Sequence, residues 1–174
     1  MLRPPTHRAD APIVYVHPSD SAWDHDRIRR ELAEYKAAGK PESTHPVMRY
    51  RNGHTRFDIE GVNGYLGADA TRWYFKRIAA LEWQDIEGLH EAQIARGSRP
   101  RSAYLRALNL SLLRVENGPP LVGEPGRWEV EDIERIAALS FFDEEERRTV
   151  DVLFDLGEAA YVASMPLSKA EKKA

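Results

Sequence analysis

The histidines are the residues of this chain best suited to acid–base or metal chemistry, because imidazole titrates near neutral pH and binds transition metals. His25 lies between Asp24 and Asp26, and His17 precedes them. Consecutive residues of a helix point to different sides, so these side chains cannot all bind one ion. The sequence contains no cysteine, which excludes thiolate ligands, disulfides and cysteine nucleophiles. We expect neither a metal site nor a bound cofactor.

Motifs of covalent catalysis give no stronger signal. The sequence has no Gly-x-Ser-x-Gly turn of the kind that presents a nucleophilic serine. Carboxylates gather at Glu144, Glu145 and Glu146. Asp143 and Glu146 have the spacing of a capping box, and a helix N-terminus favours acidic residues. We therefore expect a long helix to begin there, and a protein that is not an enzyme.

Cations close to aromatic residues form the pattern best suited to binding. Six cations are candidates for phosphate contacts: Arg49, Arg51, Arg56, Arg72, Lys76 and Arg77. The first three lie in a predicted hairpin, and the others lie beside Trp73 and Phe75 in sequence. Such cations bind phosphate while aromatic rings stack on bases. The net charge of −3 and the lack of an RNP-like or helix-turn-helix signature argue against this function. A nucleic-acid-associated module is therefore the alternative interpretation.

Asn52-Gly53 predicts the best-defined local structure, because this pair favours the positive φ angles of a two-residue type I′ turn. We expect residues 46–59 to form a β-hairpin around it. In this register Met48, Tyr50 and Phe57 share an apolar face, and the three arginines lie on the opposite face.

The stretch from Thr71 to Asn117 organises the rest of the chain. Residues 71–78 are rich in aromatic residues and predict a strand, which leads into two helices separated by Gly97-Ser98-Arg99-Pro100. The apolar stripe of the second helix runs from Tyr104 to Val115 and is wide. This helix should therefore be mostly buried.

The fold class that follows is α+β. A small antiparallel sheet is expected from residues 12–17, 46–59 and 71–78, packed against a mainly helical C-terminal half. The inward face of the last helix should include Leu153, Gly157 and Tyr161.

The ends of the chain carry charge and proline without periodicity. We expect a flexible arm at residues 1–11, a single domain at residues 12–165 and a charged tail at residues 166–174. The sequence has no run of about 18 apolar residues and no apolar segment typical of a signal peptide. We therefore expect no membrane partner and a cytoplasmic location.

Taken in order, these elements resemble the tail assembly chaperones of long-tailed bacteriophages and prophages. The resemblance covers most of residues 12–174. It is carried by the small β portion, by the transition from Thr71-Arg72-Trp73-Tyr74-Phe75-Lys76-Arg77-Ile78 into Ala80-Leu81-Glu82-Trp83, and by the helical remainder with its terminal Leu167-Ser168-Lys169-Ala170-Glu171-Lys172-Lys173. It implies a non-enzymatic protein that holds the tape-measure protein, or tail-tube subunits, during virion morphogenesis. The Asn52-Gly53 hairpin and the loop from Pro119 to Gly126 do not match this pattern, which leaves another phage morphogenesis adaptor open.

A protein of this kind needs a surface for its client. We expect an aromatic edge made of Trp73, Phe75 and Trp83, because large aromatic side chains dominate interface energetics. The leucine-rich stripes suit a groove for a partner helix, but core packing is the favoured explanation for them. Self-association is also open.

Overall fold

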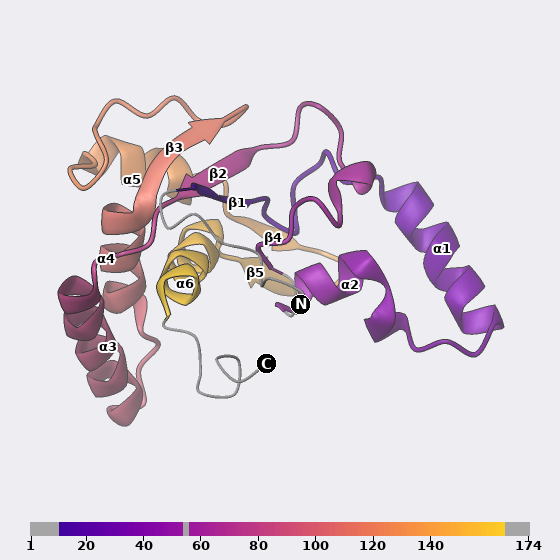
Figure 1. The fold of residues 1–174 in the computed structure, drawn as a ribbon, viewed down its shortest axis with the longest axis horizontal. Helices are drawn as coiled ribbons and strands as arrows, with labels where there is room; N and C mark the ends of the chain where they lie inside the picture. The colour runs from indigo at the N-terminus through magenta and orange to yellow at the C-terminus, as the bar shows by residue number, and fades with distance from the viewer. Residues whose placement is uncertain (1–10, 54–55, 166–174) are drawn as a thin grey trace, which may run out of the picture. The chain divides into compact units, whose positions relative to one another are not determined.

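The computed structural model describes residues 11–53 and 56–165. These residues form six α-helices, two short 3₁₀ helices and two small antiparallel sheets, one of three strands and one of two. The α+β class expected from the sequence is therefore confirmed (Figure 1). The charged tail lies outside the described residues, as does all of the expected N-terminal arm except Ala11.

The three-stranded sheet has the order β1-β2-β3, formed by β1 (Ile13–Tyr15), β2 (Arg72–Phe75) and β3 (Leu112–Glu116). The first two strands lie within the segments predicted as strands. The third strand does not come from residues 46–59, as expected, but from a segment predicted to be helical.

The predicted Asn52-Gly53 hairpin is wrong, because residues Pro46–Arg51 form helix α2. Its N-cap is His45, whose Nδ1 accepts a hydrogen bond from the backbone N–H of Val47 at 3.2 Å. The first helical residue is a proline, which suits that position. Asn52 is the C-cap, and Gly53 follows with a φ of +84°. The positive φ that glycine allows therefore ends a helix instead of turning a hairpin.

Strand β3 corrects a second expectation. The helix predicted to reach Val115 is α4 (Arg101–Ser111), which ends at Ser111 and continues directly into the strand. The carbonyl oxygen of Ser111 accepts a hydrogen bond from the Lys76 N–H at 2.8 Å, and the Ser111 hydroxyl donates to the Lys76 carbonyl oxygen at 2.5 Å. Pairing with the chain just after β2 thus satisfies backbone groups at the helix end, and it overrides the helical spacing of the following residues.

The chain forms two compact units. Of the described residues, the larger unit comprises 11–13, 74–114 and 120–165, and the smaller unit comprises 14–53, 56–73 and 115–119. The single domain expected over residues 12–165 stays a prediction.

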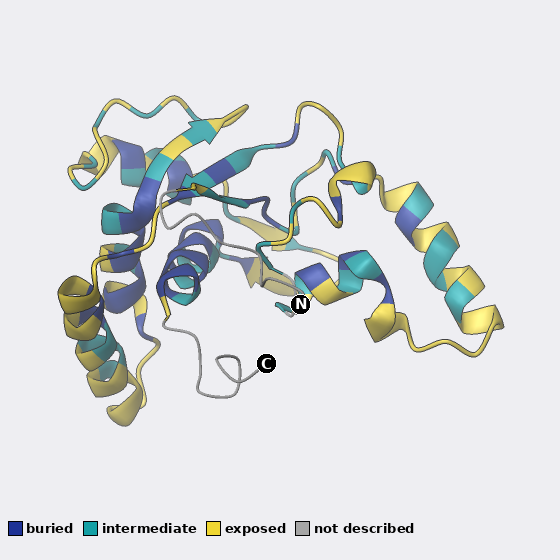
Figure 2. Cartoon of the chain, viewed as in Figure 1, coloured by how far each residue is buried: buried dark blue, intermediate teal, exposed yellow. Residues whose placement is uncertain are grey.

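The larger unit is organised around a buried C-terminal helix. Its helices are α3 (Ala80–Ala95), α4, α5 (Val130–Ala137) and α6 (Val152–Ser164). Helix α6 packs against α4 and α5, and α4 also packs against α3 (Figure 1). The approach of α6 to α4 is close, because a Cβ added at Gly157 would lie 2.7 Å from the carbonyl oxygen of Tyr104. Figure 2 shows α6 as mostly buried, in agreement with the predicted inward face at Leu153, Gly157 and Tyr161.

The prediction that the last helix begins at Asp143 is wrong. Residues Phe141–Asp143 form β4, Arg148–Val150 form β5, and these strands pair in antiparallel fashion before α6 begins. One carboxylate oxygen of Asp143 accepts the backbone N–H groups of Glu145 and Glu146, at 2.9 and 3.0 Å, so the predicted cap shapes the hairpin loop. The N-cap of α6 is Asp151, which accepts from the Phe154 N–H at 3.1 Å.

The smaller unit contains α1 (His25–Ala37), α2 and two 3₁₀ helices, η1 (Glu42–Thr44) and η2 (Asn63–Tyr65). Its core is aromatic. The hydroxyl of the buried Tyr50 accepts from the Val16 N–H at 2.8 Å and donates to the Val16 carbonyl oxygen at 3.0 Å, which ties α2 to the chain after β1. Helix α1 leaves most of its surface exposed (Figure 2). Its C-cap is Ala38, and Gly39 follows with a φ of +67°.

Candidate functional site

The aromatic residues expected to form a partner-binding edge are buried. Trp73 is 1% exposed, Phe75 0% and Trp83 6%. The indole N–H of Trp83 points to the carbonyl oxygen of Tyr161 at 3.4 Å, and the two rings stack with centroids 5.6 Å apart. A partner cannot reach these side chains in this conformation, so they belong to the core.

The hairpin face expected to carry three of the six candidate phosphate-binding cations does not form. The hairpin that was to carry Arg49 and Arg51 is helix α2, where Arg49 is exposed and the guanidinium carbon of Arg51 lies 5.5 Å from the Trp23 ring centroid. The remaining candidates are spread over a loop, β2 and the residues after it: Arg56, Arg72, Lys76 and Arg77. Arg72 donates to the side-chain oxygen of Asn63 at 3.0 Å.

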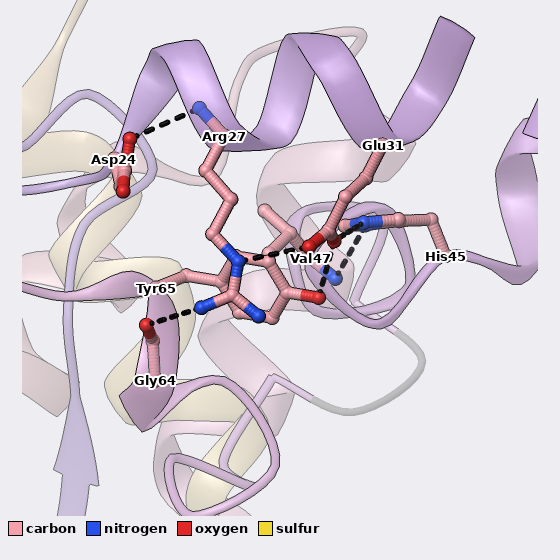
Figure 3. Close-up of polar contacts among 7 residues, drawn as sticks. All are labelled: Asp24, Arg27, Glu31, His45, Val47, Gly64 and Tyr65. Carbon is pink, nitrogen blue, oxygen red and sulfur yellow. Dashed lines mark hydrogen bonds and ion pairs between the residues drawn. The ribbon is translucent and has the colours of Figure 1, made fainter. Parts of the chain in front are cut away.

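A polar cluster in the smaller unit joins Arg27 and Glu31 of α1 to His45 and Tyr65, which are distant from them in sequence (Figure 3). The carboxylate of Glu31 accepts hydrogen bonds from the other three side chains: the Tyr65 hydroxyl at 2.6 Å, Arg27 Nε at 2.8 Å and His45 Nε2 at 2.9 Å. Arg27 also donates to the carbonyl oxygen of Gly64 at 2.9 Å, and its guanidinium lies 4.3 Å from the Tyr65 ring centroid. The cluster therefore joins α1, η2 and the start of α2.

These donors change the acidity of the groups in the cluster. The Tyr65 hydroxyl, followed by Arg27 and His45, lowers the pKa of Glu31 to about 2. Burial, together with the hydrogen bond to Glu31, raises the pKa of Tyr65 to about 12. Glu31 is consequently a fixed carboxylate and Tyr65 a fixed hydroxyl donor at neutral pH.

The geometry at His45 shows what this cluster can do. Its Nδ1 accepts from the backbone N–H of Val47, so the neutral ring carries its proton on Nε2 and donates it to Glu31. Both ring nitrogens are occupied, and the ring is fully buried. The lone pair of Nδ1 is engaged by the Val47 N–H, so His45 is not free to accept a proton from a substrate. The cluster serves to hold three elements together.

The other described histidines do not belong to a metal-binding group either. Among the residues that the structure describes, no group of three or more His, Asp or Glu side chains is arranged to hold an ion. Asp24, considered above beside His25, is the N-cap of α1 and accepts from the Arg27 N–H at 3.0 Å. His17 lies 2.6 Å from the Ser19 hydroxyl.

The most unusual surface feature is apolar and lies between α5 and the tip of the β4–β5 hairpin. Three large side chains within four positions remain substantially exposed: Leu139 by 41%, Phe141 by 43% and Phe142 by 54%. Phe141 lies opposite Val150 in the hairpin, and Phe142 lies opposite Thr149. We refer to Leu139, Phe141 and Phe142 as the hairpin patch.

Sequence reasoning missed the hairpin patch. A signal for it exists, because aromatic residues before the acidic loop and Thr149-Val150 after it are the flanks expected of a hairpin. The capping-box spacing from Asp143 to Glu146 competes with that signal and predicts a helix instead. The hairpin and its two exposed phenyl rings therefore follow from the structure alone.

Comparison with known proteins gives no match to a family model, to a curated protein or to a solved structure. In the described part of the chain, no helix has the length and apolar character needed to cross a membrane.

Proposed function

We propose that this protein is a non-enzymatic assembly chaperone or adaptor in phage tail morphogenesis, which binds the tape-measure or tail-tube protein in the cytoplasm of a bacterial host. The order of elements that carries the sequence resemblance supports a tape-measure or tail-tube protein as the client. The hairpin patch supports action by binding, and it is the observation on which this proposal depends.

The hairpin patch is suited to binding a partner because it exposes apolar area within one short segment. Covering a large apolar side chain completely is worth about 1.5–3 kcal/mol, so two half-exposed phenyl rings offer about 2 kcal/mol to a partner that covers them. Monomeric proteins expose single apolar residues routinely, but a cluster of aromatic ones is typical of an interaction site. The patch thus takes the role that the sequence assigned to Trp73, Phe75 and Trp83.

The test is co-expression of the full chain with the long, helix-rich protein encoded nearby in its source genome. The tagged chain is captured at moderate salt, and the retained complex is sized. A chaperone of this class keeps the long protein soluble and retains it. Recovery of the chain without that protein, while the long protein aggregates as it does alone, contradicts the proposal.

One observation favours a nucleic-acid-associated function as the second candidate. The guanidinium of Arg114, on β3, lies 3.6 Å from the ring centroid of Tyr74, on β2, and Lys76 and Arg77 follow that strand with exposed side chains. Cations beside an aromatic ring can bind phosphate and a stacked base. Phosphate binding weakens steeply between low and moderate salt, whereas apolar client binding does not, so a salt titration separates the two functions.

A further inference from the structure

The β4–β5 hairpin is a sheet that ends after two strands. In the described residues no third strand pairs with it. Within residues 11–53 and 56–165, no residue outside the hairpin forms a backbone–backbone hydrogen bond with Phe141–Asp143. A two-stranded ribbon is marginally stable by itself, and an unpaired edge is a template for another extended chain.

The two phenyl rings lie on either side of that edge. Successive residues of a strand point to opposite faces of the sheet, so Phe141 and Phe142 extend from opposite faces of β4. Because both rings are exposed, neither face of the ribbon is fully covered there. A strand added beside β4 would place its alternate side chains against one ring on each face. An amphipathic helix, with a single apolar stripe, would cover one ring and leave the other in water.

The charge of the hairpin loop favours an added strand with a particular charge at the end beside it. Residues 143–148 contain four carboxylates and two arginines, which gives −4 + 2 = −2. Arg148 is paired with Glu146 at 2.7 Å, and the side chain of Asp143 binds loop N–H groups. Glu144 and Glu145 are exposed, without an ion pair to another described residue. The end of an added strand that lies beside this loop should therefore be basic.

We infer that the client segment binds as a third strand on the β4 edge, antiparallel to β4, with β-branched residues at successive positions, so that each face carries a methyl-bearing side chain, and basic residues at its N-terminal end. Antiparallel pairing is the more stable arrangement, and β4 runs toward the loop, so an antiparallel partner starts beside the loop. The inference rests on the proposed function for the identity of the client. It specifies the conformation and charge of the segment that is bound.

The probe is a labelled eight-residue peptide with two lysines followed by alternating valine and threonine. Its matched control has the same composition with the two lysines at the C-terminal end. A second control is an amphipathic peptide of equal length and charge that a covalent side-chain bridge holds helical, because a free peptide this short does not form a stable helix. Each is titrated to millimolar concentration into the full chain, while NMR records the backbone amides of the protein and the carbonyl carbons of the peptide.

The expected result is binding of the first peptide at least about threefold more tightly than the reversed one, with strand-like carbonyl shifts. Among Phe141–Asp143, the amide protons that point to the free edge of β4 should gain protection from exchange on binding. Three results overturn the inference: no shift at millimolar peptide, a shift confined to residues outside β4, or tighter binding of the helical or reversed peptide. Failure of the co-expression test together with strand-like peptide binding would reject the tail-assembly client and leave the strand site in place.

Discussion

Phe141 and Phe142 are consecutive residues of β4, and each leaves about half of its side chain exposed. Neighbours on a strand face opposite sides of the sheet, so a covered ribbon would bury at least one of them. The β4–β5 ribbon buries neither ring fully, although Val150, the partner of Phe141, is buried. The exposed apolar surface therefore surrounds the strand edge, which is the relationship that a strand-binding site requires.

The contact between α6 and α4 depends on the lack of a side chain at Gly157. A Cβ at this position would meet backbone atoms of Tyr104 at 2.7 and 2.9 Å, which cannot move as a flexible side chain can. We expect Gly157→Ala to lower the free energy of unfolding by about 1–3 kcal/mol through overpacking, as measured by urea denaturation.

Gly88→Ala is the matched control for this substitution, because Gly88 lies within helix α3 and, beyond its chain neighbours and the backbone of its own helix, no heavy atom lies within 4 Å of the added Cβ. Alanine is favoured over glycine inside a helix, so this variant should gain about 0.5–1 kcal/mol. Equal effects of the two substitutions would show that α6 and α4 do not pack as described.

The Glu31 cluster should hold the smaller unit together only while Glu31 is ionised. We expect Glu31→Gln to lower the free energy of unfolding by about 1–3 kcal/mol near neutral pH, because it weakens hydrogen bonds to a charged acceptor. In the variant His45 should donate to a neutral amide oxygen instead of a carboxylate, which a shift of its ring resonances in NMR spectra would report.

Acid should remove this contribution in a defined pH range. The pKa of Glu31 is about 2 in the folded state against an ordinary value of 4.5, so the unfolded state binds the proton more readily between these values. Stability due to Glu31 is therefore complete above about pH 4.5 and falls as the pH drops toward 2. The difference between the wild type and Glu31→Gln, measured by denaturation at each pH, should shrink over that range. A difference that stays constant down to pH 2 would contradict the assigned hydrogen bonds.

Trp83 should act as a core residue and not as a binding residue. It is buried and stacked on Tyr161, so Trp83→Ala should destabilise the fold by about 3–5 kcal/mol. Leu81→Ala removes a side chain that is 78% exposed two residues earlier on α3, and it should change stability by about 0.5 kcal/mol or less. Thermal unfolding followed by circular dichroism compares the two. A folded, equally stable Trp83→Ala protein would return Trp83 to the list of surface candidates.

Sequence reasoning succeeds where the period of the pattern is long enough to be unambiguous. The inward face of α6 and the burial of α4 follow from helical spacing over three turns or more. It fails at α2, which has six residues. Val47 and Tyr50 are both buried with a helical spacing of three, while Met48 and Tyr50 have the spacing of a strand, so the segment satisfies either template. His45 and Pro46 carried the start signal that decides between them.

The candidate sites were less predictable than the fold, because they depend on tertiary contacts. The Glu31 cluster brings together residues that are up to 38 positions apart, Arg27 and Tyr65, and no local pattern indicates that they meet. At the hairpin patch, one acidic run is compatible with a helix cap and with a hairpin loop. In the structure Phe142 pairs with Thr149, so the acidic run forms a hairpin loop. Helix α6 begins later, after Asp151, which is its N-cap.

Capture of the co-expressed tape-measure protein by three forms of the chain tests whether the hairpin patch binds the client. Phe142→Thr keeps β propensity and removes an exposed ring, whereas Leu81→Gln removes an apolar side chain of greater exposure on α3. We predict that the wild type and Leu81→Gln retain the client equally and that Phe142→Thr retains at least about fivefold less while unfolding at the same temperature. Equal retention by all three folded proteins would show that the hairpin patch does not bind the client.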